Sequence, residues 1–244
     1  MKAFIALALL SFQVLASDVG LIKDFNYQLT DISQRNLSKE DLFSSMLRNG
    51  VDLEHAICAN KAHVWGFDFE NRYQIKTGKI FMFFGASIWE NASQGWMYHV
   101  APYIVENGQE WVMEASYPSE ISEPLSVDAW LENETDGRIK ASQCREIFAA
   151  DTDLTQYFYE RYNLPETRNG KPGAVCYFRK VPGHYWYPTS IAYHDLKKDE
   201  DGNEIDYNPT SFDTDDVYDA CVEIMTSKIS RFFGGGKSHC KRYK

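Results

Sequence analysis

The sequence lacks any long hydrophobic run after its first residues, and it has no internal repeat, no low-complexity stretch and no linker rich in glycine, proline or serine. A membrane-spanning helix needs about 20 mostly apolar residues, so a protein with several spans is excluded. The missing repeats exclude a solenoid, and the missing linkers exclude flexibly joined modules. We therefore expect a single domain over residues 17–244 that includes a short N-terminal helical segment.

Positive charge is also scarce. The chain has 25 Lys and Arg against 35 Asp and Glu, which gives a formal net charge of −10. This balance argues against nucleic acid or an anionic membrane surface as the main partner, since both attract basic surfaces. The basic tail KSHCKRYK is short, and we interpret it as a solvated chain end.

The first residues, MKAFIALALLSFQVLAS, have the layout of a secretory signal peptide. One lysine precedes an apolar run over residues 3–15, and Val14 and Ala16 are placed like a small-residue cleavage site. The run is too short to span a bilayer stably. We expect a signal peptide over residues 1–16 and a secreted or periplasmic protein without stable membrane insertion.

Cysteines are few, five in all, and they are unevenly placed. Four lie in the C-terminal half, at Cys144, Cys176, Cys221 and Cys240, whereas Cys58 stands alone in the N-terminal half. In an oxidising compartment the four can form two disulfides, with three possible pairings that the sequence leaves open. Cys58 is then a free thiol, which is either a reactive group or a buried apolar residue.

Apolar periodicity and turn signals predict helices towards both ends of the chain and strands between them. Helices are predicted over residues 38–48, 56–66, 126–133, 154–162 and 213–233, strands over residues 79–84, 96–105, 110–116 and 174–181, and an extended segment over residues 185–193. Asn107-Gly108, between two of the strands, is a strong hairpin signal. The pattern indicates an α+β fold with an antiparallel sheet.

A nucleophilic cysteine needs a base, and the chain has six histidines. His63 lies five residues after Cys58, so on a helix it points about 140° away and is expected to pack or to hydrogen-bond elsewhere. His55 lies three residues before Cys58 and is a rival base if the helix extends that far. His99 lies in a predicted strand and has the better context.

Hairpin pairing supplies the third group. Counting outward from the turn Asn107-Gly108 places Glu114 opposite Ala101, on the same face as His99. Diagonal neighbours of this kind are roughly 7–8 Å apart at the backbone, within reach of a long side chain. A carboxylate bound to one imidazole nitrogen fixes the tautomer and leaves the other nitrogen free to act as a base. The sequence therefore predicts a triad of Cys58, His99 and Glu114.

The predicted position of Cys58 near the start of a helix favours its thiolate, through the helix dipole and through Lys61 one turn on. Asp52 and Glu54 act in the opposite sense. The backbone N–H of Cys58 is a natural oxyanion donor. Each triad member also has an ordinary structural interpretation, as a buried thiol, a core histidine or a solvent-facing carboxylate.

Three segments, CANKAH (58–63), MYHVAPYIV (97–105) and VMEASY (112–117), resemble the protein glutaminase family of protein-glutamine deamidases, within the papain and transglutaminase-like superfamily. The order and spacing of the segments match the family pattern. The similarity extends through AVCYFRKVPGHYWYP and covers most of the chain after about residue 50. The sequence departs from the pattern at Lys61, where the family has Arg, and at Glu114, where it usually has Asp.

The resemblance implies a papain/transglutaminase-like fold, with the cysteine at a helix N-terminus packed on an antiparallel sheet. It also implies deamidation of exposed glutamine side chains in proteins or peptides. Cys58 would attack the amide, His99 would transfer protons, and water would resolve a thioester. A transglutaminase or a cysteine protease would use the same triad, and a non-catalytic exported binding protein is a further alternative.

No cofactor or metal is expected, and the protein is expected to be a monomer. Residues 199–206, DEDGNEID, resemble part of a calcium loop, but they fail at its first and last ligand positions and are interpreted as a solvated turn. Substrate-binding residues stay unassigned.

Overall fold

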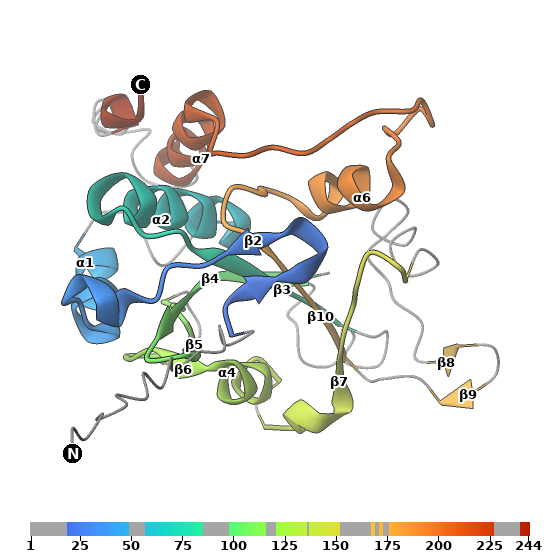
Figure 1. The fold of residues 1–244 in the computed structure, drawn as a ribbon, viewed down its shortest axis with the longest axis horizontal. Coiled ribbons are helices and arrows are strands. Elements are labelled where there is room, and N and C mark those ends of the chain that lie inside the picture. Colours follow the sequence, from blue (N-terminus) through green and yellow to red (C-terminus); the bar gives the residue numbers. More distant parts are fainter. Residues whose placement is uncertain are drawn as a thin grey trace, which may run out of the picture.

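The computed structural model describes residues 19–48, 57–84, 98–115, 121–135, 137–151, 167–168, 171–172, 176–226 and 240–244. A six-stranded sheet in the order β6-β5-β4-β3-β10-β7 forms its centre (Figure 1). The strands are β3 (Gly78–Phe84), β4 (Tyr98–Glu106), β5 (Gln109–Val112), β6 (Leu125–Ser126), β7 (Cys144–Glu146) and β10 (Cys176–Pro182). All neighbours are antiparallel except β7, which is parallel to β10.

Helices cover the sheet on both sides. They are α1 (Lys39–Leu47), α2 (Cys58–Tyr73), α4 (Val127–Asn133), α6 (Pro188–Leu196) and α7 (Thr214–Thr226). The short strands β1 (Leu21–Ile22), β2 (Tyr27–Gln28), β8 (Thr167–Arg168) and β9 (Lys171–Pro172) form two small hairpins. In Figure 1, α2 and α7 lie above the sheet and α4 lies below it. The predicted α+β fold, with a cysteine at a helix N-terminus packed on an antiparallel sheet, is confirmed.

Small residues let α2 approach the sheet closely. Ala59 and Ala62 are fully buried in one cluster with Phe81, Phe83 and Val100, which lie on β3 and β4. Short side chains on the helix and large rings on the strands fill the space between the layers without voids. This packing fixes the height of the first turn of α2 above β4.

The β4–β5 hairpin has the predicted register. Asn107 and Gly108 both adopt positive φ, 52° and 70°, as a two-residue turn of the right twist requires. The Asp31 carboxylate accepts hydrogen bonds from both turn amides, at 3.0 and 2.8 Å. The ladder then runs outward from the pair Glu106–Gln109. The turn and its carboxylate clamp therefore set which residues of the two strands lie opposite each other.

Two disulfides join Cys144 to Cys176 and Cys221 to Cys240, and Cys58 is free. The first joins residues that lie directly opposite each other in the parallel pair β7–β10. The second holds the C-terminal turn on α7. The structure thus selects one of the three pairings that the sequence leaves open.

Three predicted elements differ from the structure. The extended segment predicted over residues 185–193 is wrong, because Pro188 begins helix α6 at a position where its missing N–H costs nothing. The helix predicted over residues 56–66 continues to Tyr73, since Gly66 sits inside it against Phe212 and does not end it. The strand predicted over residues 110–116 ends at Val112.

Other predictions lie outside the described residues. They are the signal peptide, His55, the helix over residues 154–162 and the end of the helix predicted to reach residue 233.

Among the described residues, no helix combines the length and apolar character needed to cross a membrane.

Arg179 of β10 joins the N-terminal segment to helix α6. Its guanidinium is buried, forms an ion pair with Asp24, and donates to both carboxylate oxygens of Asp195 at 3.1 and 3.2 Å. It also donates to the carbonyl of Ile147 at 2.9 Å. A buried charge is tolerated only when it is paired and hydrogen-bonded in this way.

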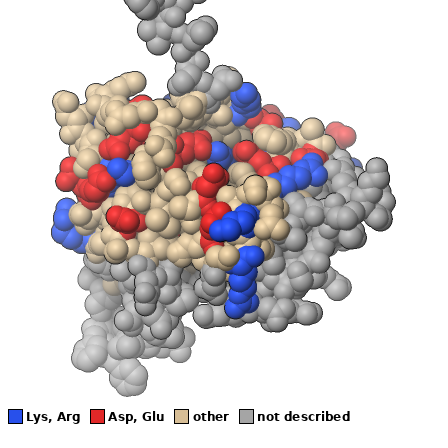
Figure 2. All heavy atoms as spheres, turned by 90° about the horizontal axis from the view of Figure 1, so that it is seen from below, with Lys and Arg blue, Asp and Glu red and all other residues tan. Residues whose placement is uncertain are grey.

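Charged side chains are mixed on the face seen in Figure 2, where Lys and Arg are scattered among Asp and Glu and form no continuous basic surface.

Gly78 leaves room for an aromatic ring. A Cβ atom at this position would overlap the ring of Tyr103, which lies opposite it in the β3–β4 ladder. We expect Gly78→Ala to lower the free energy of unfolding by about 1–3 kcal/mol, because the ring must leave its rotamer. Thermal and urea denaturation measure the loss. Combining it with Tyr103→Leu should cost less than the two single changes together, and strict additivity would contradict the overlap.

Candidate active site

Cys58 is the first residue of α2 and is half-buried. The preceding residue, Ile57, is the N-cap, and its apolar side chain makes no capping hydrogen bond. The N–H groups of Asn60 and Lys61 turn back to the carbonyl of Ile57, at 3.1 and 3.2 Å. The thiol therefore lies at the positive end of a long helix whose first turn is not capped by a side chain.

His99 is the second residue of β4, paired with Met82 of β3, and it is 1% exposed. Its Nε2 atom lies 2.7 Å from Oε2 of Glu114. The Cys58 thiol is close enough to the ring to raise the pKa of His99. Because Glu114 binds Nε2, the other ring nitrogen, Nδ1, is the one left for a thiol. The ring thus has a carboxylate on Nε2 and the thiol in its neighbourhood.

The hairpin register brings Glu114 to His99. Beyond the last paired residue of β5, the N–H of Met113 still donates to the carbonyl of Pro102 at 2.8 Å. The ladder therefore continues one step, which places Glu114 opposite Ala101 and diagonal to His99. Glu114 is fully buried, so the interpretation of a solvent-facing carboxylate is excluded.

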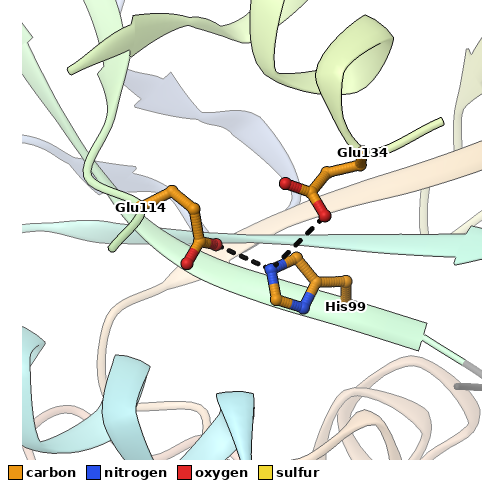
Figure 3. Close-up of side chains that lie close together, drawn as sticks. All are labelled: His99, Glu114 and Glu134. Carbon is orange, nitrogen blue, oxygen red and sulfur yellow. Dashed lines mark hydrogen bonds and ion pairs between the residues drawn. The ribbon is translucent and has the colours of Figure 1, made fainter. Parts of the chain in front are cut away.

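A second carboxylate, missed in the sequence, also faces His99. Glu134 is the C-cap residue of α4, and its Oε2 atom lies 3.7 Å from Nε2 of His99. Figure 3 shows Glu114 and Glu134 approaching the same ring nitrogen from different elements. The side chain of Glu134 is 10% exposed. No local pattern in the sequence points to it, because only the packing of α4 brings it to β4.

Trp130, one turn before Glu134 on α4, packs against the imidazole. The two rings are stacked, with centroids 5.9 Å apart and planes at 27°, and Trp130 is fully buried. The indole excludes water from one face of His99. In such a dry environment, charges act on the ring more strongly than they would in water.

Burial alone would lower the pKa of His99, since it disfavours the charged ring. The negative charges of Glu134 and Glu114, with hydrogen bonds to Cys58 and Glu114, outweigh burial and hold the pKa well above its ordinary value. The two carboxylates therefore favour the protonated imidazole.

His99, Glu114 and Glu134 also have the spacing of a metal-binding group, with one ligand atom each within 4.8 Å of the others. Two ligands of one tetrahedral zinc ion would stand about 3.3 Å apart. The Nε2–Oε2 distance of 2.7 Å between His99 and Glu114 is shorter and is that of a direct hydrogen bond. The arrangement fits a carboxylate–imidazole pair better than a metal centre.

His63 serves the core, as predicted from its angular position. It is fully buried, its Nδ1 atom lies 2.8 Å from Nζ of Lys79, and its ring stacks on Trp186 at 5.1 Å. Burial and the neighbouring Lys79 lower its pKa well below the usual range, so the ring is neutral. It faces Lys79, Trp186 and Phe212 on the buried side of α2.

Asn60 fixes the first turn of α2 from inside. Its Oδ1 atom accepts hydrogen bonds from Trp186 Nε1 at 3.1 Å and from the Tyr187 hydroxyl at 3.0 Å. Its Nδ2 atom donates to Glu223 of α7 at 2.7 Å. One amide thus ties the turn that begins with Cys58 to two other segments.

Comparison with known proteins supports a glutamine amidase. A sequence-family model described as Glutaminase matches residues 41–134. This segment contains Cys58, His99 and Glu114. This segment is similar to the glutaminase family. The family and the enzyme class predicted from the three motifs are confirmed by this match.

The glutaminase segment holds the whole of the buried site, including Glu134 as its final residue. Among solved structures, the NMR structure of protein-glutaminase from Chryseobacterium proteolyticum is similar, with a TM-score of 0.42 and 14% identity over 82% of this chain and 88% of that chain. No curated protein sequence matches the chain.

The Asn60 amide is expected to stabilise this glutaminase. Asn60→Ala removes the acceptor that a partly buried indole N–H and a phenol share, so we expect the free energy of unfolding to fall by about 1–3 kcal/mol. Asn71→Ala, at an exposed position of the same helix, is the matched control and should leave stability nearly unchanged. Urea denaturation measures both. Equal effects of the two changes would show that the amide bonds contribute nothing specific.

Proposed function

We propose that the protein is an exported protein-glutamine deamidase, which converts glutamine side chains of other proteins or peptides to glutamate. The observation that carries the proposal is a buried imidazole that is hydrogen-bonded to the Glu114 carboxylate and lies near enough to the Cys58 thiol to feel it. The family match supplies the amide of glutamine as the bond to be broken.

In the first step, the Cys58 sulfur attacks the carbon of the side-chain carboxamide. The oxygen becomes an oxyanion, and His99 donates its Nδ1 proton to the departing nitrogen, so that ammonia leaves and a thioester remains. In the second step, His99 takes a proton from water, and the resulting hydroxide attacks the thioester carbon. Collapse of this intermediate releases the glutamate side chain and restores the thiolate–imidazolium pair.

Glu114 acts through His99. Its carboxylate holds Nε2–H, which leaves Nδ1 directed at the thiol and at the leaving group. Because Glu114 is fully buried, solvent screens the attraction between its carboxylate and the imidazolium only weakly. It therefore both orients the ring and favours the protonated form that the first step consumes.

The N-terminus of α2 stabilises the oxyanion. The backbone N–H of Cys58 points out of the uncapped first turn, beside the carbon under attack, and the helix dipole adds positive potential there. Ile57, which is 56% exposed, presents an apolar surface to the substrate next to the thiol.

Export rests on the N-terminal segment and on the two disulfides, which persist in oxidising compartments. The remaining chain, residues 17–244, is proposed to be one catalytic domain that acts as a monomer. A transglutaminase or a protease would share the triad, and the products distinguish them.

The first test is ammonia release from casein, with the product examined by mass spectrometry for conversion of glutamine to glutamate. We expect wild type to release ammonia, and Cys58→Ser to lose at least about a hundredfold of that activity. Cleaved or cross-linked casein without new glutamate would be compatible with the triad but would show that the reaction is proteolysis or cross-linking and not deamidation. Equal activity of the two proteins would contradict Cys58 as the nucleophile.

Replacing Glu114 tests the third member. Glu114→Gln keeps the size of the side chain but removes its charge and can invert the tautomer, so we expect kcat to fall roughly 10²–10⁴-fold. Glu110→Gln, four residues earlier on β5 and paired with Lys180, is the matched control and should keep its activity. If Glu114→Gln were as active as Glu110→Gln, another group would have to orient His99.

A further inference from the structure

Two carboxylates, and not one, surround the Nε2 atom of His99. Glu114 binds it at 2.7 Å and Glu134 lies 3.7 Å away (Figure 3). The two come from independent elements, Glu114 from the strand hairpin and Glu134 from the end of α4. The triad needs only the first of them.

We propose that Glu134 is a second positioning residue, which keeps His99 in its protonated form so that the Cys58–His99 ion pair persists to higher pH than one carboxylate would allow. The inference rests on the proposed function in that the ion pair is the reactive state. The Glu134 carboxylate faces the imidazole, and the proposed role is exerted through His99.

The mounting of Glu134 argues for a defined geometry. Its backbone N–H donates to the carbonyl of Trp130 at 3.0 Å, which closes the last turn of α4. Trp130 stacks on the same imidazole that the carboxylate faces. The last turn of α4 therefore places the Trp130 indole on the face of His99 and the Glu134 carboxylate at its edge. The two groups are fixed to the same turn of backbone.

Burial makes this charge effective. The side chain of His99 is 2% exposed and that of Glu134 is 10% exposed, so little solvent separates the imidazolium from the carboxylate. A second carboxylate beside a protonated imidazole opposes loss of the proton. At the surface the same pair would be largely screened.

Within the described residues, the elements packed around His99 bring it Glu114 after β5, Cys58 at the start of α2, Glu134 at the end of α4 and Met82 of β3, which does not titrate. Of these groups, Glu134 and Glu114 are the carboxylates whose charge raises the pKa of His99. Removing either carboxylate should therefore lower the pH at which His99 loses its proton.

The test is a titration of the His99 ring by NMR, in protein labelled at histidine Cε1, with the His99 signal identified from its loss in His99→Gln. We expect Glu134→Gln to move the midpoint down by about one pH unit or more. Glu132→Gln, on the same helix turn but paired with Lys140 in solvent, is the matched control and should leave the midpoint in place. Coincident midpoints for Glu134→Gln and wild type would overturn the proposal.

The pH profile of kcat/KM is the second readout. The alkaline limb, which reports loss of the His99 proton, should move down in Glu134→Gln. A purely structural role would lower activity evenly at every pH and leave this limb unmoved.

Two controls separate the possible failures. If Glu134→Gln does not fold, the titration is made with Glu134→Asp. Its shorter side chain should place the His99 midpoint between that of wild type and the value expected without the carboxylate. A midpoint equal to that of wild type in Glu134→Asp would overturn the proposal. If the midpoint shifts but no variant deamidates casein, the role of Glu134 at His99 stands and the proposed reaction is wrong.

Discussion

The register of the β4–β5 hairpin is the constraint on which the site depends. A slip of one residue would turn Glu114 to the opposite face of the sheet and leave His99 without its hydrogen-bond partner. The turn at Asn107-Gly108 prevents the slip, because its left-handed backbone fits only one pairing, and Asp31 holds both turn amides. The Asp31 carboxylate, which has no part in the proposed chemistry, thereby helps to determine where the imidazole lies.

Charges inside this protein are paired rather than avoided. Arg179 is buried between Asp24 and Asp195, and His99 between two glutamates. In both places the low local dielectric strengthens the attraction and makes an unpaired member costly. At Arg179 the result is a rigid cross-link between distant segments. At His99 the two carboxylates favour the protonated ring.

The parts of the site that follow from local rules could be predicted from sequence. Alternation along a strand and the turn type of Asn-Gly are both local, so His99 and Glu114 could be placed together without a structure. Glu134 could not, because its position depends on how α4 packs on the sheet. The Cys144–Cys176 pairing was also beyond reach, since it requires a parallel edge strand formed between distant segments. At Pro188 the local signal was ambiguous, because proline suits both an extended segment and the first turn of a helix.

The stacking of Trp130 on His99 has an optical consequence. An imidazolium ring in contact with an indole accepts an electron from its excited state, whereas a neutral imidazole does so poorly. Because the two rings are stacked and buried, a change in the charge on His99 is expected to change the emission of Trp130, one of six tryptophans in the chain.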